Sequence, residues 1–169
     1  QKSLIRSHAA GMGDPVEKEV VRALMLLRTK TLASGRTGVR PVVAQTYVDL
    51  LNSGITPIVH EYGSLGCSGD LAPLAHCAMV LMGEGRATGS DGVEREVPNL
   101  LKEAGIKPIE LQEKEGLALI NGTDGMLGML ILSLHDLNKL CDQADVVAAM
   151  SVEAQMGTDQ VFRPELHEP

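Results

Sequence analysis

A glycine-rich turn that runs directly into an apolar segment constrains this chain more than any other feature. Residues 63–70 read Gly-Ser-Leu-Gly-Cys-Ser-Gly-Asp, and the composition of the residues that follow is that of an apolar helix. Closely spaced glycines let a backbone approach itself more tightly than ordinary side chains permit. The turn therefore meets the local condition for joining the amide nitrogen of Gly69 to the carbonyl carbon of Cys67.

Closure of this turn would turn part of the chain into a reactive group. Loss of water after closure, including the water that carries away the hydroxyl of Ser68, leaves a five-membered imidazolone ring with an exposed methylidene group. Such a ring is an electrophile, and no unmodified side chain supplies that chemistry. The side chain of Ser68 would become the methylidene carbon, so this residue matters most.

Other motifs rich in glycine explain the turn less well. A nucleophile elbow needs Gly-x-Ser-x-Gly, but Asp70 stands where the last glycine should be. A phosphate-binding P-loop ends in Gly-Lys-Ser/Thr, and this turn has no lysine. A plain helix entry fits, with Asp70 as N-cap and Pro73 in the first turn. A cap and a prosthetic group can share one turn, so this interpretation stands beside the first.

Three blocks of the sequence together resemble the histidine and aromatic amino acid ammonia-lyases. The glycine turn resembles the segment from which these enzymes form 4-methylidene-imidazole-5-one (MIO), with Cys67 in place of the commoner alanine. Residues 7–11, Ser-His-Ala-Ala-Gly, resemble the segment that carries a substrate-contacting histidine in the histidine-specific members. Residues 114–123, Lys-Glu-Gly-Leu-Ala-Leu-Ile-Asn-Gly-Thr, resemble the second strong block of the family, whose asparagine lies in the active site.

The resemblance implies a role for individual residues. It implies that MIO forms autocatalytically, without an external cofactor or a metal, from Cys67, Ser68 and Gly69. Asp70 is expected to cap the following helix and to position the backbone for cyclisation. Substrate contacts are expected from His8, facing an imidazole, and from Asn121. His60 and His76 are weaker candidates, and we interpret His76 as a packing residue of its helix.

The function that the resemblance implies is the non-oxidative deamination of L-histidine to trans-urocanate and ammonia, the first step of histidine degradation. Family members are several times longer than this chain and take their catalytic tyrosine and carboxylate contacts from other segments. We therefore expect an internal slice of a carbon–nitrogen lyase that is inactive alone. Two alternatives stay open: a phenylalanine or tyrosine ammonia-lyase or aminomutase, which Ser7-His8 disfavours, and a non-catalytic helical assembly protein.

Composition limits the partners that this chain can bind and the cellular compartment in which it is expected. The net charge is −7, and no basic stretch is dense enough for nucleic-acid binding. We find no run of about 18 apolar residues to span a membrane, and no leader that resembles a signal peptide. Cys67, Cys77 and Cys141 are odd in number and lack Cys-x-x-Cys spacing, which disfavours a disulfide framework or a zinc site. A reducing cytoplasm is the simplest setting.

The spacing of apolar residues, and the proline, glycine and capping residues between them, predict a mainly α-helical chain. Between the helices, residues 84–98 alternate apolar and polar positions among glycines, which indicates a short β-hairpin or loop. Helices are expected from an Asp14 N-cap with Pro15 at the first position to near Gly35, from Pro41 to Gly54, from Asp70 to about Gly83, and from Pro98 to Ala104 with Gly105 as C-cap.

The last third of the chain carries a heptad-like apolar stripe. Its positions alternate steps of three and four residues: Leu127, Leu130, Leu134, Leu137, Cys141, Ala144 and Ala148. One helix from Asp124 to Met156, or two helices broken near Cys141, would produce it. The stripe suits either a neighbouring helix or the inside of a core, and the family resemblance implies the central bundle of a homotetramer.

The predicted fold is thus a helical-bundle fragment of the aspartase/fumarase-like ammonia-lyase fold, with a short β-hairpin near 84–98. Residues 1–111 would be the MIO-bearing N-terminal part of the lyase. Residues 112–169 would begin the central helical bundle.

Overall fold

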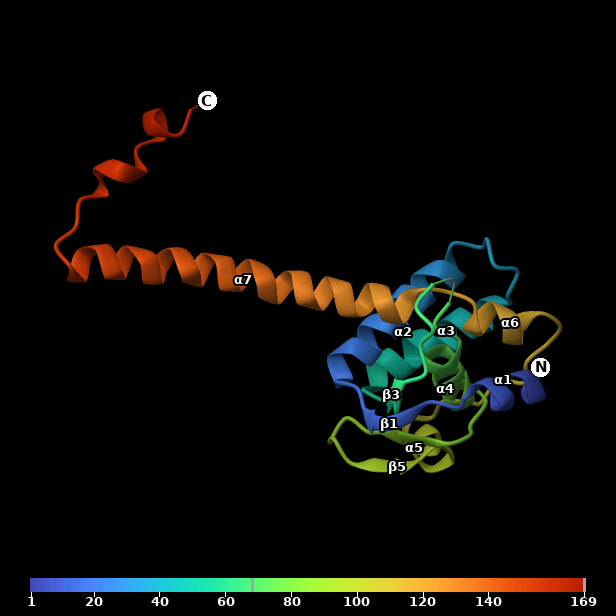
Figure 1. Cartoon of the computed structure of the whole chain (residues 1–169). Helices are drawn as coiled ribbons and strands as arrows, with labels where there is room; N and C mark the ends of the chain where they lie inside the picture. Colours follow the sequence, from blue (N-terminus) through green and yellow to red (C-terminus); the bar gives the residue numbers. More distant parts are fainter. Residues whose placement is uncertain (68, 169) are drawn as a thin grey trace. The chain divides into compact units, whose positions relative to one another are not determined.

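The computed structural model describes residues 1–67 and 69–168 (Figure 1). The chain forms two compact units, Gln1–Leu130 and Ile131–Pro169, and the boundary expected at residues 111/112 stays a prediction. The elements are α1 (Lys2–His8), β1 (Met12–Pro15), α2 (Lys18–Ala33), α3 (Pro41–Ser53), β2 (Thr56–Pro57), β3 (His60–Tyr62), α4 (Leu71–Leu81), β4 (Arg86–Thr88), β5 (Glu94–Glu96), α5 (Val97–Ala104), α6 (Glu115–Ile120), α7 (Asp124–Ala154), and the 3₁₀ turns η1 (Asp159–Phe162) and η2 (Pro164–Leu166).

Helices that begin with a proline and end at a glycine lie where the sequence predicts them. Helix α3 begins with Pro41 at its first position and ends at Gly54, whose φ of +76° is left-handed. Helix α5 ends in the same way at Gly105, with φ +68°. Proline is pre-organised for a first helical turn, and glycine adopts the left-handed cap without a Cβ penalty. The mainly helical fold is confirmed.

The predicted start of α2 is wrong. Asp14 and Pro15 belong to strand β1, and α2 begins at Lys18 with Glu17 in the N-cap position. Strand β1 pairs antiparallel with β3, and the two lie side by side in Figure 1. Proline is tolerated in such a small two-stranded sheet because its missing N–H faces no further strand. A pairing partner far along the sequence therefore overrides the local capping pattern.

The hairpin predicted near 84–98 is confirmed by strands β4 and β5, which pair antiparallel from Arg86↔Glu96 to Thr88↔Glu94. A third strand, β2, joins the other side of β4 through Thr56↔Thr88. Strand β2 is only Thr56–Pro57, too short to show alternation in sequence. The sheet therefore has one more strand than the sequence predicts.

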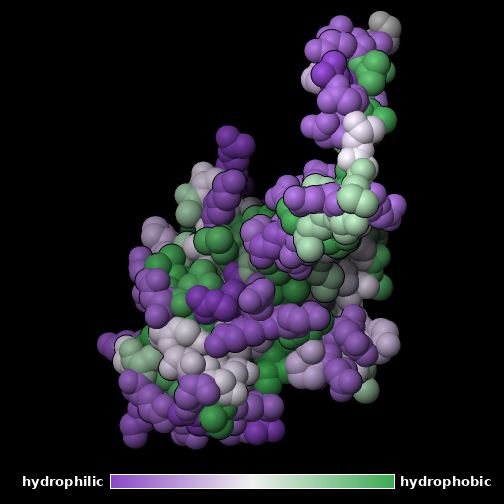
Figure 2. Space-filling model, turned by 90° about the vertical axis from the view of Figure 1, so that its left-hand side faces the viewer, coloured by the Kyte–Doolittle hydropathy of each residue, from purple (hydrophilic) through white to green (hydrophobic). Residues whose placement is uncertain are grey.

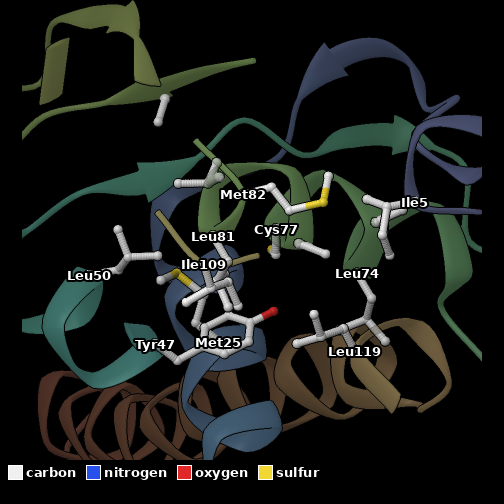
Figure 3. Packing of buried hydrophobic residues seen from close by; sticks show 14 of the residues in the cluster. Ile5, Met25, Tyr47, Leu50, Leu74, Cys77, Leu81, Met82, Ile109 and Leu119 are labelled. Carbon is white, nitrogen blue, oxygen red and sulfur yellow. The ribbon is translucent and has the colours of Figure 1, made fainter. Parts of the chain in front are cut away.

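Helix α4 lies at the centre of the core of the first unit and packs against α1, α3 and α6. Its side chains Leu74, Cys77 and Leu81 are fully buried, and Figure 3 shows them among Tyr47 of α3 and Met25 of α2. Burial in this apolar surrounding raises the pKa of the Cys77 thiol. The glycine turn directly precedes α4, so the core anchors the segment that follows the turn.

Helix α7 is one continuous helix, so the alternative of a break near Cys141 is wrong. Only Asp124, Gly125 and Gly128 of this helix are buried in the chain. The leucines of its stripe are exposed, including Leu130, Leu134 and Leu137, so the stripe is not an internal core of this chain. Other exposed apolar residues, drawn green, lie among polar ones on the face shown in Figure 2.

One stretch, Glu115–Ala154, is long and apolar enough to cross a membrane by length and composition. This finding corrects the expectation that the chain holds no such stretch. The stretch contains the turn between α6 and α7 and the buried carboxylate of Asp124. Non-helical backbone and buried charge do not occur in lipid-facing spans, so the apolar character suits packing against protein.

Candidate active site

The three sequence blocks converge at the turn between β3 and α4. Gly63 opens this turn, and a Cβ built on it would lie 3.2 Å from the Cα of Gly11, the last residue of the first block. At the other end, a Cβ on Gly69 would lie 3.6 Å from Oδ1 of Asn121 in the third block. The backbone at both places approaches its neighbours closely because glycine has no side chain.

Part of the predicted precursor can be described directly. Cys67 is exposed and Gly69 is buried, while Ser68 lies outside the described residues. Gly66 has a φ of +72°, a left-handed conformation that favours glycine. The sequence Cys67-Ser68-Gly69 holds every atom that the imidazolone ring requires, and the small residues around it leave the backbone room to turn. The residues present therefore fit the prosthetic group that the family resemblance implies.

Asp70 is fully buried and holds the turn against two other segments. Its amide donates a 2.6 Å hydrogen bond to the carbonyl oxygen of Gly122. Its carboxylate accepts hydrogen bonds from the hydroxyl of Ser64 and, at 3.0 Å, from the amide of Met126 in the first turn of α7.

The prediction that Asp70 caps α4 is half right. Asp70 occupies the N-cap position of α4, but its side chain makes no capping hydrogen bond to that helix. It satisfies an unpaired amide at the start of α7 instead. Gly125 makes this possible, because a Cβ there would lie 3.1 Å from Cγ of Asp70. The carboxylate thus joins the glycine turn to the start of α7, while the amide of Asp70 joins it to Gly122 of the third block.

Arg28 of α2 contacts the turn between α6 and α7 and fixes its position. Its guanidinium is buried and donates to the carbonyl oxygens of Ala118, at 3.1 Å, and Asn121, at 3.3 Å. It also forms a buried ion pair with the carboxylate of Asp124. A Cβ on Gly122 would overlap Nη2 of Arg28, so a side chain at this position would have to displace the guanidinium.

Glu115 holds the opposite end of α6. Its Oε1 accepts from the amide and Nε of Arg40, at 3.1 and 2.8 Å, and its Oε2 accepts from Nη2 of Arg40 and the amide of Gln112, both at 2.8 Å. The bonds from Arg40, the largest cause, lower the pKa of Glu115 from 4.5 to about 2. The carboxylate therefore stays ionised well into acid.

His8 is the last residue of α1, a helix that packs against α4 and α6. The side chain is half-buried, and its Nδ1 lies 2.9 Å from the carbonyl oxygen of Leu4 and 3.0 Å from Oγ of Ser7. A carbonyl oxygen only accepts, so Nδ1 carries the proton in this contact. In the neutral ring Nε2 is then an acceptor, which leaves it able to meet a donor.

His76 of α4 has a more specific part than general packing. Its Nε2 accepts a 3.1 Å hydrogen bond from the amide of Gly11, three residues beyond His8. Burial, and then the neighbouring His60 ring at 5.3 Å, lower the pKa of His76. The neutral ring thus fastens the segment that follows α1 onto α4.

Sequence reasoning missed Arg28, Asp124 and Ser64. One signal for Arg28 was available, because it stands at helical spacing from Val21, Leu24 and Leu32 on the apolar face of α2. A charge at such a position calls for a buried partner. Nothing local identifies Asp124 as that partner, since it lies 96 residues away in the sequence.

Comparison with known proteins places this chain in a family. The family model described as aromatic amino acid lyase matches residues 1–169. The chain is 68% identical over 167 residues to the histidine ammonia-lyase of Streptomyces avermitilis, covering 99% of this chain and 33% of that protein. It therefore spans about a third of the length of the curated relatives that it matches.

Solved structures agree in fold. Histidine ammonia-lyase from Trypanosoma cruzi is 36% identical with a TM-score of 0.93, over 98% of this chain and 33% of that one. Tyrosine aminomutase from Streptomyces globisporus is 44% identical with a TM-score of 0.84, over 90% of this chain and 28% of that one. From its sequence, its fold and the convergence of its three blocks, the chain belongs to the aromatic amino acid lyase family.

Proposed function

We propose that the full-length protein carrying this sequence deaminates L-histidine to trans-urocanate and ammonia through an MIO group made from Cys67, Ser68 and Gly69. The observation that carries the proposal is the proximity of Gly69 to Asn121, whose Oδ1 lies 3.6 Å from where a Cβ on Gly69 would be, so that the turn lies beside the third block. The 68% identity to a histidine ammonia-lyase supports the substrate.

The residues of this chain would act around the group rather than supply it. When present, MIO provides an electrophilic carbon that activates the substrate. Asn121 ends α6 with its side chain exposed beside Gly69, where an amide can hydrogen-bond the amino group of a substrate. His8, with Nδ1 bonded to Leu4, would present Nε2 to the imidazole of L-histidine.

The base that removes the β-proton is assigned to another segment of the protein. Tyr47 is fully buried in the core, and burial raises the pKa of its hydroxyl well above the ordinary value. Tyr62 is exposed in β3. A base must reach a proton of the bound substrate, and neither position favours that.

We further propose that the full-length enzyme is a cytoplasmic homotetramer. The exposed leucines of α7 support this assembly, because an apolar helical stripe of this length gains stability by packing against other helices. Sedimentation of the full-length protein tests it directly, since a monomer at micromolar concentration would contradict the proposal.

A second candidate is an aminomutase or ammonia-lyase that acts on tyrosine or phenylalanine. The 44% identity to a tyrosine aminomutase favours it, and this exceeds the 36% to the trypanosomal histidine ammonia-lyase. Residues Ser7-His8 favour histidine, as the resemblance of their block implies.

A side-by-side assay of the full-length protein decides between them. L-histidine, L-tyrosine and L-phenylalanine are supplied separately; the conjugated acids that a lyase forms are followed by absorbance, and the β-amino acids that an aminomutase forms are separated by chromatography. We expect urocanate from L-histidine, with activity lost in Ser68→Ala and a deficit of two water molecules in the peptide that contains Ser68. If only tyrosine or phenylalanine gave a product, the proposal that His8 contacts the imidazole of L-histidine would be wrong. If the peptide that contains Ser68 were unmodified in soluble, assembled protein, the alternative of a non-catalytic helical assembly protein would be favoured.

A further inference from the structure

We propose that Arg28 is a positioning residue for formation of the prosthetic group. Through its contacts with Asp124 and the turn 121–123, it would hold the Gly69–Asp70 peptide in the geometry that cyclisation needs. The inference rests on the proposed function, because it concerns the same MIO group.

The first step of the argument is the position of the guanidinium. Arg28 is 2% exposed and contacts three acceptors that follow one another along the chain, in Ala118, Asn121 and Asp124. These acceptors end α6, form the turn and begin α7. The planar fork of arginine can meet several acceptors at once, whereas the compact ammonium of lysine cannot reproduce that pattern.

The second step runs from this turn to the reacting backbone. The carbonyl oxygen of Gly122 accepts the amide of Asp70 at 2.6 Å, and Oδ1 of Asn121 lies beside Gly69. Gly122 packs so closely against the guanidinium that a Cβ there would overlap it. A shift of the turn would therefore move the partner of the Asp70 amide and, with it, the peptide next to the attacking nitrogen.

The third step is the chemistry that this geometry would serve. The nitrogen of Gly69 bonds to the carbonyl carbon of Cys67, and the former carbonyl oxygen leaves as water with the protons of the Gly69 and Ser68 amides. A second water takes the hydroxyl of Ser68 and its Cα proton, which leaves the methylidene double bond. No oxidant or reductant is needed, so the rate depends on holding the nitrogen close to the carbon.

The experiment separates positioning from stability in the full-length protein. Arg28→Met alone leaves Asp124 buried and unpaired, while the double variant Arg28→Met/Asp124→Leu replaces the pair with apolar side chains and should recover most of the lost Tm. We expect the double variant to acquire the two-water deficit about 100-fold more slowly than wild type. The rate at which Arg28→Lys acquires the two-water deficit should lie between those of wild type and the double variant.

A matched control tests whether loss of stability alone slows formation of the prosthetic group. Leu101→Ala creates a cavity in α5, at a buried residue whose side chain lies beside Gly83 rather than the α6–α7 turn. It should lower Tm and yet form the prosthetic group at the wild-type rate. Equal rates in the double variant and wild type would overturn the inference, as would an equally slow Leu101→Ala.

The two proposals fail separately. Absence of urocanate from wild-type protein that carries the two-water deficit would overturn the substrate proposal, while the ratio of maturation rates would still test Arg28. Wild-type protein without the deficit would overturn both, because no group would then be formed.

Discussion

The two ends of helix α6 are each held by an arginine and a carboxylate, but at different depths. At the C-terminal end the side chains of Arg28 and Asp124 are 2% and 8% exposed. At the N-terminal end Glu115 is 2% exposed, whereas Arg40 is 38% exposed. The same chemistry therefore operates in the interior at one end and at the edge of solvent at the other.

The difference indicates where the molecule needs fixed geometry. Burying both members of an ion pair has a large desolvation cost, and such pairs are often no better for stability than apolar residues. The chain nevertheless buries the pair beside Asn121, at the end of α6 that meets the glycine turn. At the other end, where Arg40 reaches water, the pair mainly stabilises the loop before α6.

The largest effect should come from Arg28→Met. The variant leaves the Asp124 carboxylate buried without its partner, and we expect the free energy of unfolding to fall by about 3–5 kcal/mol. Urea denaturation of the full-length protein measures the loss. Arg28→Met/Asp124→Leu serves as the control, and a double variant as unstable as the single one would contradict this explanation.

A smaller effect is expected from Glu115→Gln. The amide oxygen still accepts from the backbone of Arg40 or Gln112, and the freed guanidinium turns to water. The loss in the same urea experiment should be less than half of that for Arg28→Met. A loss as large as that of Arg28→Met would break the distinction between the two ends.

Acid should weaken the ion pair at the N-terminal end of α6. The folded-state pKa of Glu115 is depressed to about 2 from 4.5, so its stabilisation is present above pH 4.5 and is lost as the pH falls toward 2. We expect the gap in urea midpoint between wild type and Glu115→Gln to be full at pH 6 and to narrow by about pH 3. A gap that stays constant with pH would show that the ionised carboxylate is not responsible.

The smallest effect should follow from Arg6→Gln, which removes an exposed pair with Glu84. The side chains are 58% and 27% exposed, and their hydrogen bonds of 2.7 and 2.8 Å are as short as those of Glu115. Solvent-exposed pairs contribute little because water and salt screen them. Urea denaturation should detect no change, and a clear loss would mean that depth is not what ranks these pairs.

The sequence predicts best those features that depend on adjacent residues. Pro41 and Gly54 bound α3 as expected, and Gly69 and Asn121, each from a predicted motif, lie close together in the structure. The start of α2 was missed because β1 pairs with residues 60–62. Arg28 and Asp124 were missed for the same reason, since an ion pair across 96 residues leaves no local pattern. Asp70 was placed correctly, but its side-chain partner lies in α7.

Gly122 also has a consequence for mutational tolerance. We expect the precursor triplet to accept Cys67 in place of alanine, because only the backbone of this residue would enter the ring. Gly122 makes no bond in the proposed chemistry, yet a Cβ there would overlap the guanidinium of Arg28 and the carboxylate of Asp124, so a larger residue would have to displace this buried ion pair. In a library of random variants, the position farther from the reacting atoms should therefore be the less tolerant of the two.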